Sequence, residues 1–386
     1  MQVKKIGIIT LNGEFNYGNR LQNFALQKVL EGYGVEVETI VIRPSKFDKL
    51  KKECWIGEIR SIDDLGQMFK KNISKITLKS IKRRKNYQAM QAAKWSTIEQ
   101  FSQKKIKTLR VDKKYLNQLS LHFDLFIVGS DQVWNPNIIE FDPTHFLDFA
   151  PSEKRYSYSA SFGVDHLPSK PTLLKPHYAS YLKQMNYISV REASGMRIVE
   201  ELIGRKVDVA PDPTLLLSKT EWQKELAITE NQEEQFVLIY FVSEISVEIM
   251  QEIKRFAKEK NLRIFQIMGD TFGSDRIIVD PQQFVSMIAK ARYVFTDSFH
   301  GSVFSIIMQT PFFVYERTDH KGTYTRIEHL VEKFYMRCAL VFLGDHLTEK
   351  ETLFDFDRAK IVLEKERERG KQLIEQNILT FSKVEQ

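Results

Sequence analysis

An alternation of predicted strands and helices, repeated along nearly the whole chain, limits the possible folds more than any other feature. Short apolar runs typical of buried strands are followed by residues spaced for amphipathic helices. The strand-like runs lie at residues 3–10, 35–42, 123–129, 155–162, 187–191, 236–242, 263–267, 293–295 and 312–315. Such alternation predicts an α/β protein, in which helices cover both faces of parallel sheets.

The length of the chain divides this pattern into two parts. A chain of 386 residues is too long for one ordinary hydrophobic core. The alternation also starts again after the stretch 211–213, Pro-Asp-Pro, which cannot continue a helix. We therefore expect two Rossmann-like doubly wound domains facing a cleft, at residues 1–205 and 206–386. The charged last helix, near residues 355–377, is expected to cross back to the first domain.

The composition is that of a soluble globular protein, with 42% apolar and 28% charged residues. No apolar run approaches the roughly 20 residues that a membrane-spanning helix needs. The first eleven residues lead directly into a strand and lack a signal-peptide pattern, so we expect a cytoplasmic location. The two cysteines, Cys54 and Cys338, support neither a disulfide framework nor a zinc site. We expect no metal and no cofactor.

The excess of positive charge is concentrated in one segment. Residues 66–114 contain fifteen Lys or Arg and only two acids. Five apolar residues fall roughly on one helical face: Leu65, Met68, Phe69, Ile73 and Ile76. We expect a basic helical insertion at about 45–120, in which residues 65–114 contact an anionic membrane peripherally. A merely solvated charged face is the alternative, and no nucleic-acid partner is expected because no nucleic-acid-binding motif is present.

A histidine follows the predicted strand at 293–295. The sequence Thr296-Asp-Ser-Phe-His-Gly301 supplies residues that cap a helix, and an apolar helix pattern comes after it. His300 is therefore expected at a helix N-terminus and at the carboxyl end of a strand, where open α/β sheets bind ligands. An imidazole there can contact an anion and move a proton near neutral pH. A histidine that only caps or packs is the alternative.

The loop after the first strand carries four candidate ligand-binding residues: Asn16, Tyr17, Gly18 and Asn19. It opens a helix, and its glycine permits close approach by a ligand. The loop lacks both the GxGxxG spacing of dinucleotide sites and the lysine of a P-loop. A purely structural turn is the alternative.

The strand at 123–129 also ends in polar and aromatic residues: Ser130, Asp131, Gln132, Trp134 and Asn135. Loops at this edge of a sheet often contact ligands. Trp134 is expected to offer a flat face to a sugar ring. Asp131 is either a base for an acceptor hydroxyl or a helix cap.

Three cations lie at further strand ends. Arg191 ends the strand at 187–191, and its planar guanidinium suits a phosphate or a carboxylate. Lys321 and Arg326 follow the strand at 312–315 and are expected to form an anion-binding site beside His300. The alternatives are a surface pair of Arg191 with Glu192, and ordinary solvated charge at the other two positions.

Several of these blocks, in this order, resemble the polysaccharide pyruvyl transferase family. They are Asn16-Tyr-Gly-Asn-Arg20, Phe123-Asp-Leu-Phe-Ile-Val-Gly-Ser-Asp-Gln-Val-Trp-Asn135, Ile188-Ser-Val-Arg191, Asp212-Pro-Thr214 and Thr296-Asp-Ser-Phe-His-Gly301. The resemblance implies a GT-B-like arrangement of two Rossmann-like domains. It also implies transfer of the enolpyruvyl unit of phosphoenolpyruvate to two hydroxyls of one sugar, which forms a cyclic ketal and releases phosphate. No metal is implied.

The resemblance assigns roles to the candidate residues. His300 is the expected acid, and His300 or Asp131 is the expected base. The donor, phosphoenolpyruvate, is expected to contact Arg191, Ser298, Gly301, Lys321 and Arg326. The acceptor is expected to contact Asn16, Tyr17, Gly18, Asn19, Ser130, Gln132, Trp134 and Asn135. The implied acceptor is a sugar, on a lipid-linked precursor, of a capsular, exopolysaccharide or cell-wall unit.

The chain departs from the family at one position. Better-studied members have Arg-Leu-His where this chain has Ser298-Phe299-His300, so a cation is missing beside the histidine. Arg326 or Lys321 is the hypothetical replacement. Two other functions stay open: a GT-B-type glycosyltransferase that uses a nucleotide sugar, and a non-catalytic binding subunit of a polysaccharide assembly complex.

Overall fold

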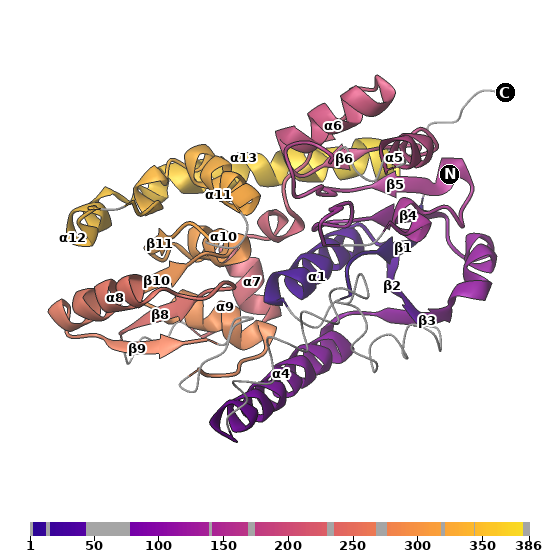
Figure 1. The fold of residues 1–386 in the computed structure, drawn as a ribbon. Coiled ribbons are helices and arrows are strands. Elements are labelled where there is room, and N and C mark those ends of the chain that lie inside the picture. The colour runs from indigo at the N-terminus through magenta and orange to yellow at the C-terminus, as the bar shows by residue number, and fades with distance from the viewer. Residues whose placement is uncertain are drawn as a thin grey trace.

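The described residues form two main parallel sheets, of five and four strands, and a short two-stranded one. The computed structural model describes residues 3–12, 16–43, 78–138, 141–168, 174–229, 235–267, 276–317, 321–342 and 344–380. Figure 1 shows the two main sheets side by side, the C-terminal one on the left and the N-terminal one on the right, with helices packed around each. The prediction of an α/β fold built from two Rossmann-like units is confirmed.

The N-terminal sheet has the strand order β3-β2-β1-β4-β5, which is that of a doubly wound Rossmann unit. Its strands are β1 (Lys5–Ile9), β2 (Glu36–Arg43), β3 (Thr108–Asp112), β4 (Leu125–Val128) and β5 (Arg155–Ser157). A short parallel pair, β6 (Ser189–Val190) and β7 (Asp208–Val209), is joined to the β5 side by isolated bridges. The helices of this half are α1 (Tyr17–Gly32), α4 (Leu78–Lys105), α5 (Leu174–Leu182) and α6 (Ala193–Ile203).

The C-terminal sheet has four parallel strands in the order β11-β10-β8-β9. They are β8 (Phe236–Tyr240), β9 (Arg263–Gln266), β10 (Tyr293–Thr296) and β11 (Phe312–Val314). The helices are α7 (Lys219–Glu225), α8 (Val247–Glu259), α9 (Pro281–Lys290), α10 (Phe299–Met308), α11 (Lys321–Lys333), α12 (Leu347–Lys350) and α13 (Phe356–Ile374). All five residues of β8 are buried, because alternate side chains enter two different apolar cores.

The two halves share one apolar core. Tyr17 of α1 stacks on Phe284 of α9, with ring centroids 4.8 Å apart. Phe24 of α1 contacts Trp222 of α7, which in turn meets Phe304 of α10. Aromatic contacts of this kind hold the start of α1 close to the start of α10.

The last helix spans both halves. Figure 1 shows α13, in yellow, running over the C-terminal sheet and ending beside the helices of the N-terminal half. Gly370 of α13 lies against Leu216, Pro211 and the hydroxyl of Tyr158, a residue just beyond β5. Because β7 pairs with β6, the N-terminal sheet also extends past residue 205, where we had expected the first domain to end.

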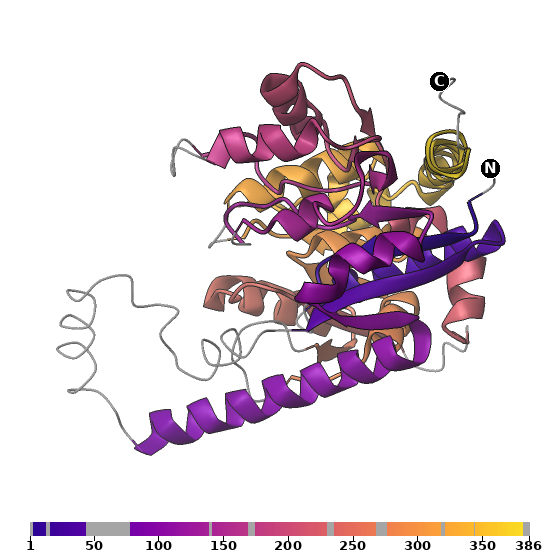
Figure 2. The same cartoon turned by 90° about the vertical axis from the view of Figure 1, so that its right-hand side faces the viewer.

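The segment expected to be a helical insertion is only partly helical. Residues 108–112 form β3, which pairs with β2 along its whole length, so the prediction of an insertion reaching residue 120 is wrong there. The C-terminal part of α4 packs on the protein, because Ile98 and Phe101 are buried and the Thr97 hydroxyl donates to the backbone oxygen of Val279. Figure 2 shows α4 along one side of the molecule.

Much of the predicted membrane-contact face, residues 65–77, lies outside the described residues, and contact with an anionic membrane stays a prediction. In the described part of the chain, no helix is both long enough and apolar enough to cross a bilayer.

We predict that Gly370→Ala destabilises the protein. A Cβ at this position would lie 2.4 Å from Leu216 Cδ2 and 2.7 Å from Pro211 Cγ, so buried neighbours would have to move. Overpacking of this kind typically costs about 1–3 kcal/mol, to be measured by urea unfolding. In the matched control, Gly32→Ala, the new methyl group meets nothing within 4 Å. A Gly370→Ala protein as stable as wild type would contradict the close packing of α13 against Leu216 and Pro211.

Candidate active site

A buried carboxylate, that of Asp212, lies at the centre of the candidate site. It follows β7 and is 1% exposed. Its Oδ2 is 3.0 Å from Arg191 Nη1 and 3.6 Å from His300 Nε2. Its Oδ1 accepts hydrogen bonds from the backbone N–H and the hydroxyl of Thr214. Sequence reasoning placed Asp212 in the Pro-Asp-Pro stretch and in a block that resembles the family, but did not select it as a site residue.

The charges around Asp212 are mutually compensated. Burial alone raises the pKa of the Asp212 carboxyl, but the imidazole of His300, the guanidinium of Arg191 and the Thr214 hydroxyl outweigh it and hold this pKa well below its usual range. Burial likewise lowers the pKa of Arg191, and the carboxylates of Glu192, Asp212 and Asp131 together raise it above its usual value. Both groups are therefore charged at neutral pH.

His300 lies against the start of α1. It is buried at the first turn of α10, and its ring contacts Gly18 in the first turn of α1. A Cβ on Gly18 would lie 2.0 Å from His300 Nδ1, so no other residue fits without moving the imidazole. Gly18 was predicted to make room for a ligand, and in the structure it makes room for His300.

Asp131 connects α1 to Arg191. Its Oδ2 accepts a hydrogen bond of 3.1 Å from Asn19 Nδ2, and its Oδ1 is 3.7 Å from Arg191 Nη1. Asp131 has a φ of 65°, an uncommon conformation for a residue other than glycine. Aspartate adopts this left-handed region more readily than most residues do.

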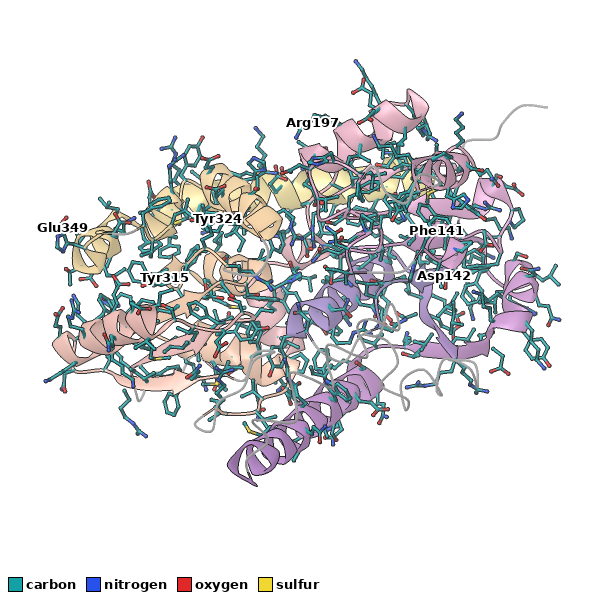
Figure 3. The ribbon with its side chains drawn as sticks, viewed as in Figure 1. Phe141, Asp142, Arg197, Tyr315, Tyr324 and Glu349 are labelled. Atoms are coloured by element: carbon teal, nitrogen blue, oxygen red, sulfur yellow. The ribbon has the colours of Figure 1, made fainter. Side chains whose placement is uncertain are left out.

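Asp212 also lines a cavity of about 300 Å³. Its charged lining residues are Arg191, Glu192, Arg197, Asp212, Arg326, Lys333 and Arg369. The guanidinium groups of Arg191 and Arg326 lie over the ring of Phe299, 4.7 and 6.0 Å from its centroid. Arg197, labelled in Figure 3, comes from α6. His300 is not among the lining residues and lies behind Asp212.

Arg326 is a buried cation of this cavity that makes no ion pair with the residues described, whereas Arg197 is exposed. Arg326 is 8% exposed, and within the described parts of the chain its Nε has no hydrogen-bond partner. Burial and the nearby charge of Arg191 lower the pKa of Arg326 to about 10, so it is still charged at neutral pH. Lys333 and Arg369, in contrast, are each 2.6 Å from Glu366. The cavity therefore presents an unpaired buried cation, which an anionic ligand would neutralise.

The two aromatic residues predicted to bind the acceptor lie in the core instead. Trp134 is 1% exposed, stacks on Phe146 and donates from Nε1 to the backbone oxygen of His145. It cannot offer a face to a sugar, so that prediction is wrong. Tyr17 is fully buried against Phe284, and its predicted acceptor contact is wrong for the same reason.

Four polar candidates of the N-terminal half have partners within the protein. Ser130 is buried, with its hydroxyl donating to the backbone oxygen of Ser159, so it does not reach an acceptor. Asn135 Nδ2 donates to Gln132 Oε1 at 2.5 Å. The Asn16 side chain caps α1 by accepting from the backbone N–H of Gly18.

The predicted donor residues are only partly brought together. Arg191 and Arg326 share the cavity, whereas Ser298 caps α10 by accepting from the backbone N–H of Gly301. At Gly301 a Cβ would lie 2.6 Å from Thr296 Oγ1, which explains the glycine by packing alone. Lys321 begins α11, and its side chain lies outside the described part. No cluster of three potential metal ligands occurs among the residues described.

A family model described as polysaccharide pyruvyl transferase matches residues 16–320 of the chain. No curated protein matches it. Solved structures of similar overall fold include the UDP-GlcNAc 2-epimerase from Methanocaldococcus jannaschii, 14% identical, with a TM-score of 0.48 over 96% of this chain and 98% of that chain. The glycosyltransferase SnogD from Streptomyces nogalater is 11% identical, with a TM-score of 0.41 over 96% of each chain. At these scores the likeness carries no inference about activity.

We predict that Asp212→Asn lowers the free energy of unfolding by roughly 3–5 kcal/mol at pH 5–7, because it leaves buried cations without their anion. The pKa of Asp212 is depressed in the folded state, so its contribution is complete above the unfolded-state value of about 3.9 and is lost as the pH falls below it. The difference in stability between wild type and Asp212→Asn should therefore shrink between pH 5 and pH 3, as followed by urea unfolding.

The control for this series is Asp165→Asn, at an exposed carboxylate. It should track the wild type at every pH. A stability difference for Asp212→Asn that stayed constant down to pH 3 would show that Asp212 is not held as a charged group.

Proposed function

Because the chain belongs to the polysaccharide pyruvyl transferase family, a family of transferase enzymes, we propose that it transfers the enolpyruvyl unit of phosphoenolpyruvate to a sugar. The acceptor contributes two hydroxyls of one sugar in a surface-polysaccharide or cell-wall precursor. The products are a cyclic pyruvate ketal and inorganic phosphate.

The observation that supports this donor most directly is the cation-rich cavity with its unpaired Arg326. Phosphoenolpyruvate carries a phosphate and a carboxylate close together, and guanidinium groups bind both in a planar, two-point manner. Arg191 and Arg326 face this cavity from different helices and strands. The start of α6, at Ala193, also lines it and adds backbone N–H groups that favour an anion.

The cavity also supports an explanation of the missing arginine. Ser298 occupies the position where related proteins have Arg, and its hydroxyl is used to cap α10. Arg326 lies in the second turn of α11. Its guanidinium lies over the ring of Phe299, the residue that follows Ser298. We propose that Arg326 supplies from α11 the charge that Ser298 cannot supply from α10.

We assign proton delivery to the pair of His300 and Asp212. The reaction adds one proton to the methylene carbon of the donor, breaks the bond between C2 and the phosphate oxygen, and forms two bonds from C2 to sugar oxygens. Of the two hydroxyl protons, one balances the new methyl group and the other leaves with phosphate. Asp212 lines the cavity and its Oδ2 lies 3.6 Å from His300 Nε2, so the carboxylate is placed to orient the imidazole that we propose as the proton donor.

Asp131 is the proposed base for the acceptor hydroxyls. Its carboxylate lies on the N-terminal side of Arg191, held by Asn19, while Asp212 contacts the same guanidinium. The carboxylates of Asp131 and Asp212 thus both contact the guanidinium of Arg191. Asp212 serves the protonation of the donor, and Asp131 serves the deprotonation of the acceptor. A base and an acid separated in this way can act on different substrates in one site.

The decisive experiment is incubation of the purified protein with phosphoenolpyruvate and a panel of sugar acceptors, including lipid-linked ones. We expect acceptor-dependent phosphate release together with an acceptor mass increase of one pyruvate ketal, and loss of both in His300→Ala. Release of a nucleoside diphosphate from a sugar nucleotide would instead favour a glycosyltransferase. Binding of donor without turnover on any acceptor would favour a non-catalytic subunit.

A second prediction concerns Arg326. We expect Arg326→Met to weaken phosphoenolpyruvate binding about 10- to 100-fold, as measured by calorimetry, since charged hydrogen bonds contribute about 1.5–3 kcal/mol. The Tm of the unliganded variant should equal or exceed that of wild type, because a buried unpaired charge is removed. Arg255→Met, at an exposed position of α8, is the matched control. Unchanged donor affinity in Arg326→Met would remove this residue from the donor site.

A further inference from the structure

A second, larger cavity opens at the carboxyl ends of β1, β2 and β3. Its volume is about 970 Å³, and it shares no lining residue with the cation-rich cavity. The loop that closes it on one side begins near Asp142, which Figure 3 labels together with Phe141. Its main polar lining residues are Asn12, Arg43, Lys113, Asp142, Thr144 and His145. Open α/β sheets bind ligands at this edge.

The lining suits a ligand with many hydroxyl groups. Carboxylate and amide oxygens accept hydrogen bonds, and ammonium and guanidinium groups donate them. A ligand hydroxyl can donate to the first kind and accept from the second. Two of the three described lining cations are paired, since Lys113 lies 3.5 Å from Asp142 and Arg43 lies 3.6 Å from Asp112. The ammonium of the third, Lys114, lies over the ring of Tyr115. An anion is therefore less favoured here than in the cavity that holds Arg326.

His145 lines this cavity with a partly buried imidazole ring. Its Nδ1 is buried, and the residues described provide no hydrogen-bond partner for it. Burial lowers the pKa of His145, Asp142 acts in the opposite direction, and Lys113 lowers it further, so the ring is neutral at neutral pH. A neutral imidazole nitrogen can donate to a hydroxyl or accept from one. Because His145 lines the cavity, its ring is positioned to contact a ligand hydroxyl.

Trp134 supports the side of the cavity that contains His145. Trp134 Nε1 donates to the backbone oxygen of His145 at 2.9 Å, and the Trp134 ring stacks on Phe146. Trp134 therefore supports the cavity without touching its contents. This contact explains why a tryptophan follows β4 although it is not exposed.

The larger cavity is connected to the catalytic network through α1. Asn12, at its edge, accepts a hydrogen bond of 3.2 Å from Arg20 Nη1. Arg20 Nε donates to Asn19 Oδ1 at 3.0 Å, and Asn19 in turn donates to Asp131. On the same side, the hydroxyl of Thr10 donates to the backbone oxygen of Ser130, the neighbour of Asp131.

We propose that this larger cavity binds the saccharide acceptor, with the reacting sugar toward Asp131 and the rest of the glycan along the ends of β1–β3. The inference rests on the proposed function and specifies the acceptor site within it.

The test uses a printed array of bacterial surface oligosaccharides, probed with the full-length protein in the presence of saturating phosphoenolpyruvate. We expect wild type to bind at least one saccharide, and His145→Ala to bind it at least 10-fold more weakly. Lys113→Ser, at a mostly exposed side chain, is the second variant and should also weaken binding at least 10-fold. His122→Ala, at an exposed histidine outside the cavity, should bind as wild type does. Each variant is checked for an unchanged Tm.

Donor binding, measured separately by calorimetry, distinguishes the two proposals. Weaker saccharide binding in both variants, with phosphoenolpyruvate binding retained, supports the acceptor site. Saccharide binding that depends on His145 and Lys113 in a protein that never binds phosphoenolpyruvate would refute the donor and still support this cavity as a saccharide site. Any other pattern, including the absence of saccharide binding by wild type, overturns the assignment.

Discussion

The site is organised around one buried negative charge. A carboxylate as buried as that of Asp212 is strongly disfavoured unless cations and hydrogen-bond donors surround it. Its partners come from separate parts of the fold: Arg191 follows β6, Thr214 lies in the next helical turn, and His300 begins α10 of the other half. Satisfying this single charge therefore fixes the relative positions of the two sheets at their carboxyl ends.

The apolar packing around this charge makes the close approach possible. Tyr17 and Phe24 anchor α1 on α9 and α7, and this brings Gly18 against the imidazole of His300. The stability of the interface thus comes from the burial of aromatic side chains. Its geometry at the site depends on Gly18, which has no side chain and lets His300 approach α1. Two cavities flank the resulting network. One is small and cationic, and the other is larger and lined by mixed polar groups.

Local sequence signals predicted the elements and their ends well. The capping roles of Asn16 and Ser298, and the place of His300 at a strand end, follow from residue types and short spacings. The same local signals misled at Trp134 and Tyr17. A polar loop with an aromatic residue looks the same in sequence whether the ring faces a ligand or Phe146 and Phe284, because those partners are distant in the chain. The strand β3 was missed because a surrounding run of lysines hid its pattern.

The sequence by itself determined the α/β class, the two-unit arrangement, and the set of residues at the carboxyl ends of the strands, since each depends on periodicity and near neighbours. Only the tertiary structure decided which of those residues face a cavity and which are buried supports. It also revealed Asp212 as the centre, Arg326 as a buried cation without an ion pair among the described residues, and His145 at a separate cavity. The reason is physical: burial and charge compensation depend on the sum of contacts from distant segments, and no local stretch of sequence contains that sum.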